Sequence, residues 1–468
     1  MSQIDFDALL RLLSFTPGEP MLFNSGLFLV LFLLFSAGYA LLSAQRAKAV
    51  RLLYVTAFSY YFYYKNAGAW CCLLAVITLV NYFCALRLDR TERPAARKAW
   101  LWLAVGFMIG QLAVFKYTDF AIGTWCDLTG EPRPDTPALP VLVGISFFTF
   151  QSMSYIIDVY RRQMPATRSL TDFAFFVSFF PTLLAGPILR ARTFLPQLQK
   201  PLCVTQQMLG TGTWFIIVGL FKKCVISDYI SVNFVSRIFD NPALYSGLEN
   251  LLGIYGYALQ LYCDFSGYSD MAIGIALWMG FEIPANFRAP YKSDSITDFW
   301  RRWHISLSSW LRDYLYISLG GNRKGRLRMY FNLFLTMLLG GLWHGASWNF
   351  VIWGSVHGFA LGVHKRFREL LGHDRHYQST GIRRFFAVLL TFHLVCFCWL
   401  FFAGTSFEAS MQMIGQICSN FNPQLLPQFL EGYPLVSALM VGGFVLHFLP
   451  TAWNGKAEIL AGRTPLPV

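Results

Sequence analysis

The stretch Gly340-Gly-Leu-Trp343-His344-Gly-Ala-Ser347-Trp348-Asn349 places a histidine between two apolar runs, at 329–343 and 346–363. The small residues on both sides of the histidine permit a turn and a close approach of the two runs. His344 follows Arg328 by 16 residues, which corresponds to about 24 Å of helix. A polar group at this depth in a membrane is costly and is usually functional, so His344 is a candidate site residue.

The composition of the whole chain agrees with apolar, membrane-crossing helices. Only 13% of the 468 residues are charged, against about 25% in soluble domains. This excludes a soluble globular domain, a disordered chain and a coiled coil. The sequence predicts an all-α, polytopic membrane protein with about 11 crossings, at 22–42, 50–64, 70–86, 99–118, 139–157, 207–227, 250–281, 329–343, 346–363, 385–403 and 435–451.

The distribution of basic residues predicts the orientation in the membrane. The net charge is +13, and the basic residues are clustered in the loops between apolar runs. This pattern is typical of membrane proteins, so we expect a lipid bilayer as partner and no nucleic acid. With the N-terminus outside, 31 Lys and Arg residues lie in cytoplasmic segments and 4 in outer segments, as the positive-inside rule requires. We expect a short extracytoplasmic segment at 1–20, one transmembrane domain at 21–451 with its active region at 250–364, and a cytoplasmic tail at 452–468.

Two apolar segments do not read as ordinary crossings. The run 329–343 is short, and 172–189 contains Pro181 and Gly186-Pro187 between basic loops, which predicts a broken, re-entrant element. Irregular backbone at membrane depth requires hydrogen-bond partners from protein or water. An internal polar cavity is therefore expected in this part of the chain.

Two carboxylates, Asp264 and Asp270, interrupt the apolar run 250–281. They are six residues apart, so they do not share one helix face unless the helix breaks at Gly267. We favour a buried, hydrogen-bonded polar cluster over a direct catalytic role.

A second polar group follows helical spacing, which predicts one helix with a mixed aromatic and polar stripe: Trp300, Trp303, His304, Leu307, Ser308 and Leu311. Asp298 precedes Arg301 and Arg302 at distances suited to ion pairing. A helix lying in the lipid interface is the alternative, but it leaves His304 unexplained.

The remaining histidines and cysteines give weaker signals. His357 and His364 follow His344 at helical spacing and are candidates to line the same cavity as His344. We interpret His393 and His447 as structural. His373 and His376 lie in a basic loop, and we expect their substitution to have no effect. The ten cysteines show no metal-site spacing, and the motifs of serine hydrolases, P-loop enzymes, zinc proteases and Rossmann enzymes are absent from the sequence.

Several motifs in the same order resemble the membrane-bound O-acyltransferase family, and within it the bacterial branch that acetylates alginate and related exopolysaccharides. The similar stretches are 23–28, 143–155, 180–188, 264–271, 300–316 and 342–348. The departures are about twenty additional N-terminal residues, Cys263 in place of an aromatic residue, and a C-terminal part without a matching motif.

The resemblance implies a ring of membrane helices around a central tunnel, with His344 as the principal catalytic histidine and His304 as the second. It implies acetyl-CoA as donor, no bound cofactor, and location in a bacterial inner membrane. The expected partners are a periplasmic SGNH-like acetyltransferase and a polysaccharide synthase or export complex, and the polymer would be one such as alginate or cellulose.

Other candidate residues are expected around the two histidines. Those that would line the tunnel or substrate site are Trp303, Trp343, Asn349, Ser308, Asp264 and Asp270; those that would bind donor phosphates are Arg301, Arg302 and Arg312. No metal site is expected. Two alternatives stay open: D-alanyl transfer to teichoic acid within the same family, and a transporter without enzymatic activity in which His344 is structural or gating.

Overall fold

The computed structural model describes residues 6–44, 48–135, 139–140, 142–372, 377 and 379–464. These residues form helices and loops, with no strand among them, which confirms the all-α prediction. They divide into two compact units, the first made of Met1–Gly212 and Met271–Pro284 and the second of Thr213–Asp270 and Ala285–Pro467.

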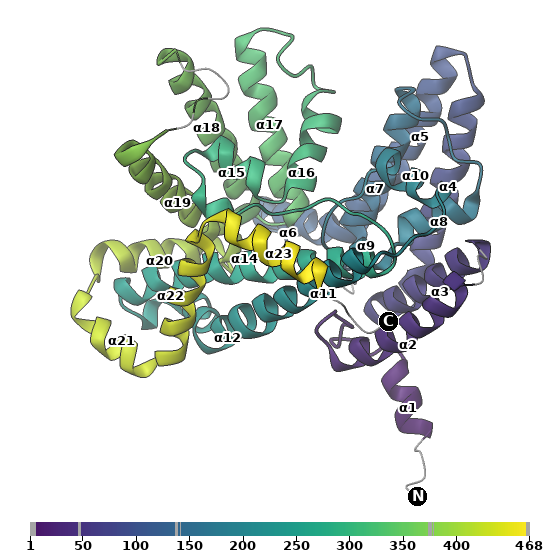
Figure 1. The fold of residues 1–468 in the computed structure, drawn as a ribbon. Coiled ribbons are helices and arrows are strands. Elements are labelled where there is room, and N and C mark those ends of the chain that lie inside the picture. Colours follow the sequence, from purple (N-terminus) through teal and green to yellow (C-terminus); the bar gives the residue numbers. More distant parts are fainter. Residues whose placement is uncertain are drawn as a thin grey trace, which may run out of the picture. The chain divides into compact units, whose positions relative to one another are not determined.

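Most of the first unit is the part of the chain drawn from purple through blue to teal in Figure 1. Its helices are α1 (Phe6–Leu13), α2 (Gly26–Ala44), α3 (Lys48–Ala67), η1 (Gly68–Trp70), α4 (Cys71–Arg90), α5 (Pro94–Leu112), η2 (Ala113–Tyr117), α6 (Thr118–Thr129), α7 (Ile145–Tyr160), α8 (Leu170–Ser178), α9 (Phe180–Leu183), α10 (Ala191–Gln199) and the start of α11 (Gln206–Leu220).

Phenylalanine packing holds the centre of the first unit. The ring of Phe180 lies 5.0 Å from Phe58 and 5.4 Å from Phe35, with edge-to-face geometry in both pairs. Phe180 follows a break in the helix at Phe179, and Pro181 opens the next short helix. The predicted break within 172–189 is therefore confirmed.

The second unit contains the candidate site. Its helices are η3 (Phe221–Ser227), α12 (Asp228–Ile230), η4 (Ser231–Val235), α13 (Ser236–Asp240), η5 (Pro242–Leu244), most of α14 (Gly247–Trp278), η6 (Pro290–Lys292), α15 (Ile296–Arg302), α16 (Ile305–Trp310), η7 (Leu311–Tyr316), α17 (Arg326–His344), α18 (Trp348–Leu370), α19 (Gly381–Ala403), α20 (Phe407–Ser419), η8 (Pro423–Leu425), α21 (Leu426–Gly432), α22 (Pro434–Phe448) and α23 (Thr451–Arg463).

Helix α14 continues through Gly267 without a break. The glycine serves a close approach instead, because a Cβ atom placed there would lie 2.7 Å from the carbonyl oxygen of Gly219 in α11. Asp264 and Asp270 therefore project from one continuous helix.

Fewer helices are long and apolar enough to cross a membrane than the sequence predicts. Among the described residues four helical runs qualify: Gly26–Ser43, Lys48–Arg90, Pro94–Thr129 and Gly381–Ala403. A fifth is counted if Pro423–Gly432 and Pro434–Phe448, bent by 104°, form one span. Each of the 11 predicted ranges contains a helix, but the ring of about 11 crossings is not confirmed. Helix α7, with 16 residues, is short for a crossing, and α14 carries three carboxylates.

Candidate active site

Glycines bring α17 and α18 into close contact, as the paired helices in Figure 1 show. A Cβ atom at Gly354 would lie 2.6 Å from the carbonyl oxygen of Met337, and one at Gly341 would lie 2.3 Å from that of Phe350. Small residues at such positions allow the backbones of membrane helices to touch. This packing fixes the end of α17, where His344 is the last helical residue.

His344 lies in an aromatic enclosure. Its ring centroid is 4.9 Å from that of Trp343, 5.1 Å from Trp353 and 5.2 Å from Phe402. His344 is partly accessible, so a substrate hydroxyl can reach its imidazole.

His304 breaks the helix that the sequence predicts through residues 300–311. Helix α15 ends at Arg302 and α16 begins at Ile305, with His304 at φ 42° between them. This left-handed conformation is uncommon for a residue other than glycine, so the prediction of one helix with a continuous stripe is wrong. The lipid-interface alternative is wrong as well, since Trp300, Trp303 and His304 are all buried.

Trp343 joins the two histidines into one site. The Trp343 ring lies 6.2 Å from the ring of His304 and 4.9 Å from that of His344. The two histidines are 40 positions apart in the sequence, yet they face the same indole. Trp343 itself is buried.

Asp264 and Asp270 of α14 form ion pairs with two lysines that are adjacent in the sequence. Lys222 Nζ lies 2.6 Å from Asp270 Oδ2, and Lys223 Nζ lies 2.6 Å from Asp264 Oδ1. Lys223 also contacts Asp228 Oδ1 at 2.7 Å. The ion pairs agree with the predicted polar contacts, but the predicted burial is wrong for Asp264, whose side chain is 44% exposed.

A cationic cavity of about 770 Å³ lies in the same unit, and the candidate residues Arg301, Arg312 and Ser308 line it, whereas His304 and His344 do not. Lys365 and Arg368 of α18 also line it, with Glu369 as the acidic residue of the lining. The cavity volume falls within the range of small-molecule sites.

Trp300 connects this cavity to the aromatic enclosure of His344. Its side chain lines the cavity, and its ring lies 5.7 Å from that of Trp353, which in turn contacts His344. The indole Nε1 of Trp300 donates a hydrogen bond of 3.3 Å to Nδ1 of His357. Two tryptophans thus lie between the cationic cavity and the imidazole of His344.

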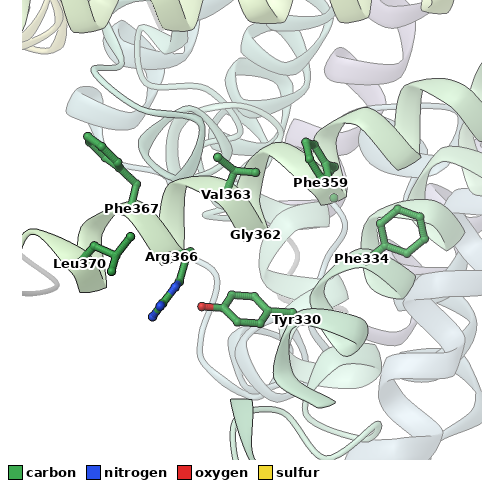
Figure 2. A pocket seen from close by; sticks show the side chains of 9 residues that line it. Tyr330, Phe334, Phe359, Gly362, Val363, Arg366, Phe367 and Leu370 are labelled. Atoms are coloured by element: carbon green, nitrogen blue, oxygen red, sulfur yellow. The ribbon is translucent and has the colours of Figure 1, made fainter. Parts of the chain in front are cut away.

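A second hollow on α17 and α18 has a different character (Figure 2). It has a volume of about 440 Å³ and is lined almost entirely by apolar groups, with Arg366 and Tyr330 as its polar members. Figure 2 shows Phe334 and Phe359 on neighbouring helices along this hollow. It contains none of the candidate residues.

The other candidate residues have structural contacts. Arg302 pairs with Asp298 at 2.7 Å, which confirms the predicted pairing at four residues. Asn349 Nδ2 donates to the carbonyl oxygen of Gly404 at 3.0 Å and thereby links α18 to the end of α19. Trp303 packs between Phe299 and Trp399 in the hydrophobic core.

The remaining histidines are distributed as follows. His364 lines the cationic cavity and its Nδ1 lies 2.8 Å from Thr297 Oγ1. His393 contacts the Tyr255 hydroxyl at 2.8 Å, and His447 accepts a hydrogen bond of 3.1 Å from the backbone N–H of Tyr291. His373 and His376 lie outside the described residues.

Sequence reasoning missed several residues of the site. Lys365 and Arg368 stand in a basic segment that looks like any cytoplasmic loop, so nothing in the pattern distinguishes them. Asn286 lies in the loop after α14, and its Oδ1 is 3.1 Å from Nδ1 of His304. Helical periodicity carries no signal for a contact between a loop and a helix break.

Comparisons with known proteins agree with the motifs. Residues 127–403 match the membrane-bound O-acyltransferase family. A probable alginate O-acetylase AlgI of Pseudomonas putida is 42% identical over 96% of this chain and 90% of its own length. The peptidoglycan O-acetyltransferase of Helicobacter pylori is 36% identical over 84% of this chain and 79% of its own. The teichoic acid D-alanyltransferase of Bacillus subtilis is 33% identical over 59% of this chain and 73% of its own length.

Proposed function

Because the chain belongs to the membrane-bound O-acyltransferase family and is an acyltransferase, we propose that it transfers acetyl groups for the O-acetylation of an exopolysaccharide such as alginate or cellulose. The donor is acetyl-CoA from the cytoplasm. The similarity to alginate O-acetylases over nearly the whole chain supports acetyl transfer over D-alanyl transfer.

The proposed setting is a bacterial inner membrane, with a periplasmic N-terminus and a cytoplasmic C-terminus. About 11 membrane-crossing segments within 21–451 would surround a central tunnel, with 452–468 as a cytoplasmic tail. The 31 to 4 distribution of Lys and Arg supports this orientation. A periplasmic SGNH-like acetyltransferase would receive the acetyl group and complete its transfer within a polysaccharide synthase or export complex.

One observation carries the proposal: a cavity lined by four cations is connected to the aromatic enclosure of His344 through Trp300, which lines the cavity, and Trp353, which contacts His344. Coenzyme A brings phosphates at one end and a thioester at the other. Arg301, Arg312 and Arg368 would bind the phosphates. Among the described residues the buried Nε of Arg368 has no hydrogen-bond partner, which favours an anion at this point.

His344 would act as the general base. It removes the proton from the accepting hydroxyl while the hydroxyl oxygen attacks the thioester carbonyl. The resulting tetrahedral intermediate collapses to the acetyl ester, and the coenzyme A sulfur leaves and recovers the proton from His344. His304 would orient the hydroxyl toward His344.

Membranes that contain the protein and its native acceptors test the choice of donor. With labelled acetyl-CoA we expect labelled ester in polymer or acceptor protein, and we expect none from a D-alanyl carrier protein. D-alanyl transfer without acetyl transfer would overturn the proposal.

A further inference from the structure

Asn286 is a buried amide beside the helix break at His304. Its Oδ1 accepts hydrogen bonds from the Ser306 backbone N–H at 3.2 Å and from the Ser306 hydroxyl at 2.9 Å. A backbone N–H can only donate, so the amide atom that faces it must be the oxygen. The orientation of the Asn286 amide is thereby determined by its neighbours.

The same oxygen determines the tautomer of His304. Nδ1 of His304 lies 3.1 Å from Asn286 Oδ1, and an oxygen acceptor at this place requires a proton on Nδ1. A neutral imidazole carries one proton, so Nε2 then holds the lone pair and acts as an acceptor.

The backbone around Asn286 supports the strained conformation of His304. The Ile305 N–H donates to the carbonyl oxygen of Asn286 at 2.9 Å, and the Arg288 N–H donates to that of Arg302 at 3.0 Å. Residues 286–288 thus bond to both sides of the break. A left-handed residue other than glycine persists only where its surroundings enforce it, which is a common property of functional sites.

Aromatic side chains restrict the plane of the same imidazole. Phe265 meets it edge to face with the ring centroids 4.6 Å apart, and Trp343 lies 6.2 Å away on the side shared with His344. The Nδ1 hydrogen bond and these rings together restrict the orientation of His304.

We infer that Asn286 is a positioning residue that holds neutral His304 with its proton on Nδ1 and with Nε2 as a hydrogen-bond acceptor. The catalytic consequence of this inference rests on the proposed function. His304 in this form has no N–H to offer to an oxyanion, so it accepts a hydrogen bond from the attacking hydroxyl and directs the oxygen toward the thioester. Oxyanion stabilisation must come from another donor.

Two substitutions of Asn286 separate positioning from a purely structural role. Asn286→Leu removes the acceptor, and we expect kcat to fall on the order of 10²-fold, the usual contribution of a correctly placed acid–base group. Asn286→Asp keeps the acceptor and should restore most of kcat.

The aspartate also gives a pH signature. A carboxylate beside Nδ1 favours protonated His304, which cannot accept at Nε2, so the acidic limb of the pH–kcat profile should move to higher pH. Asn332→Asp is the control, since Asn332 is also buried but bonds to the carbonyl oxygen of Gly321. Asn332→Asp should leave the acidic limb of the pH–kcat profile at the same pH as in the unmodified protein. An unshifted limb in an active Asn286→Asp protein would overturn the inference.

A measurement that needs no activity keeps this inference separate from the proposed function. Solid-state ¹⁵N NMR of histidine-labelled protein, with the His304 signal assigned by its loss in His304→Gln, should show the proton on Nδ1. A proton on Nε2 would overturn the assignment of Asn286 even if acetyl transfer is established. If the proton is on Nδ1 but the protein transfers no acetyl group, the positioning role of Asn286 stands and the proposed function is rejected.

Discussion

At the scale of single residues, the two histidines have different surroundings and should make different contributions. His344 is partly accessible at the end of α17, whereas His304 is buried and its Nδ1 faces Asn286. We predict that His344→Ala lowers kcat by roughly 10²–10⁴-fold, the range for loss of a general base. His304→Ala should reduce kcat less, because an orienting group matters less than the base.

The prediction is that His344→Ala lowers kcat more than His304→Ala does. Protein abundance in membranes should stay nearly unchanged in both variants. His373→Ala serves as the control and should retain full activity, because the sequence assigns His373 no role in the site. An indispensable His304 together with an active His344→Ala protein would mean that the two roles are assigned the wrong way round.

The cavity cations give a second residue-scale prediction. Arg301→Gln combined with Arg368→Gln should raise the KM for acetyl-CoA roughly tenfold or more, since a hydrogen bond to a charged group contributes about 1.5–3 kcal/mol. The KM for acetylpantetheine, which lacks the coenzyme A phosphates, should change little.

Arg366→Gln is the matched control, because Arg366 stands on the same helix but lines the apolar hollow. It should leave both KM values unchanged. An equal rise of KM for acetyl-CoA and acetylpantetheine in the double variant would show that the cavity does not bind phosphates.

Residue chemistry could be predicted from the sequence where it depends on local context. His344 stands out because polar groups at membrane depth are rare, and His304 because a helix in the lipid interface leaves it unexplained. The Asp298–Arg302 pair follows from helix spacing. The helix break at His304 could not be predicted, because it depends on Asn286, which is 18 positions earlier and outside any helix.

At the scale of helices, the contact between α17 and α18 should be sensitive to one methyl group. A Cβ atom at Gly354 would lie 2.6 Å from the Met337 carbonyl oxygen, so Gly354→Ala should destabilise the protein by about 1–3 kcal/mol, as overpacking does. The measurement is Tm in detergent, together with acetyl transfer, which should fall as the end of α17 shifts.

Gly442→Ala in α22 is the control. A Cβ atom at Gly442 meets nothing within 4 Å, so the alanine should leave Tm unchanged or raise it slightly, since alanine favours helix by up to about 1 kcal/mol. An unchanged Tm in Gly354→Ala would contradict the close packing on which the position of His344 depends.

The positions of the helices were largely predictable, whereas their interruptions were only partly so. Pro181 marks a real break, because proline removes a backbone donor. Gly267 does not mark one, since its glycine serves the approach of α11 to α14. A glycine in an apolar run is compatible with a helix break or with close packing of another helix. Which of the two occurs depends on the neighbouring helix.

At the scale of the whole molecule, two native cysteines test the proposed orientation. Cys418 and Cys203 are both exposed; Cys418 lies in the segment 404–434 that we place outside, and Cys203 in a segment that we place in the cytoplasm. A membrane-impermeant maleimide should modify Cys418 in intact spheroplasts and Cys203 only after lysis, as read by mass spectrometry of peptides. The reverse pattern would invert the topology.

The most direct test of the central claim is acetyl movement across the membrane in inside-out vesicles that contain the protein and its native acceptors. Labelled acetyl-CoA added outside the vesicles reaches only the cytoplasmic face. We predict that labelled ester accumulates on acceptors within the lumen, and that His344→Ala abolishes this accumulation at equal protein abundance. Lumenal label that is the same in His344→Ala, or no lumenal label with the unmodified protein, would contradict the account.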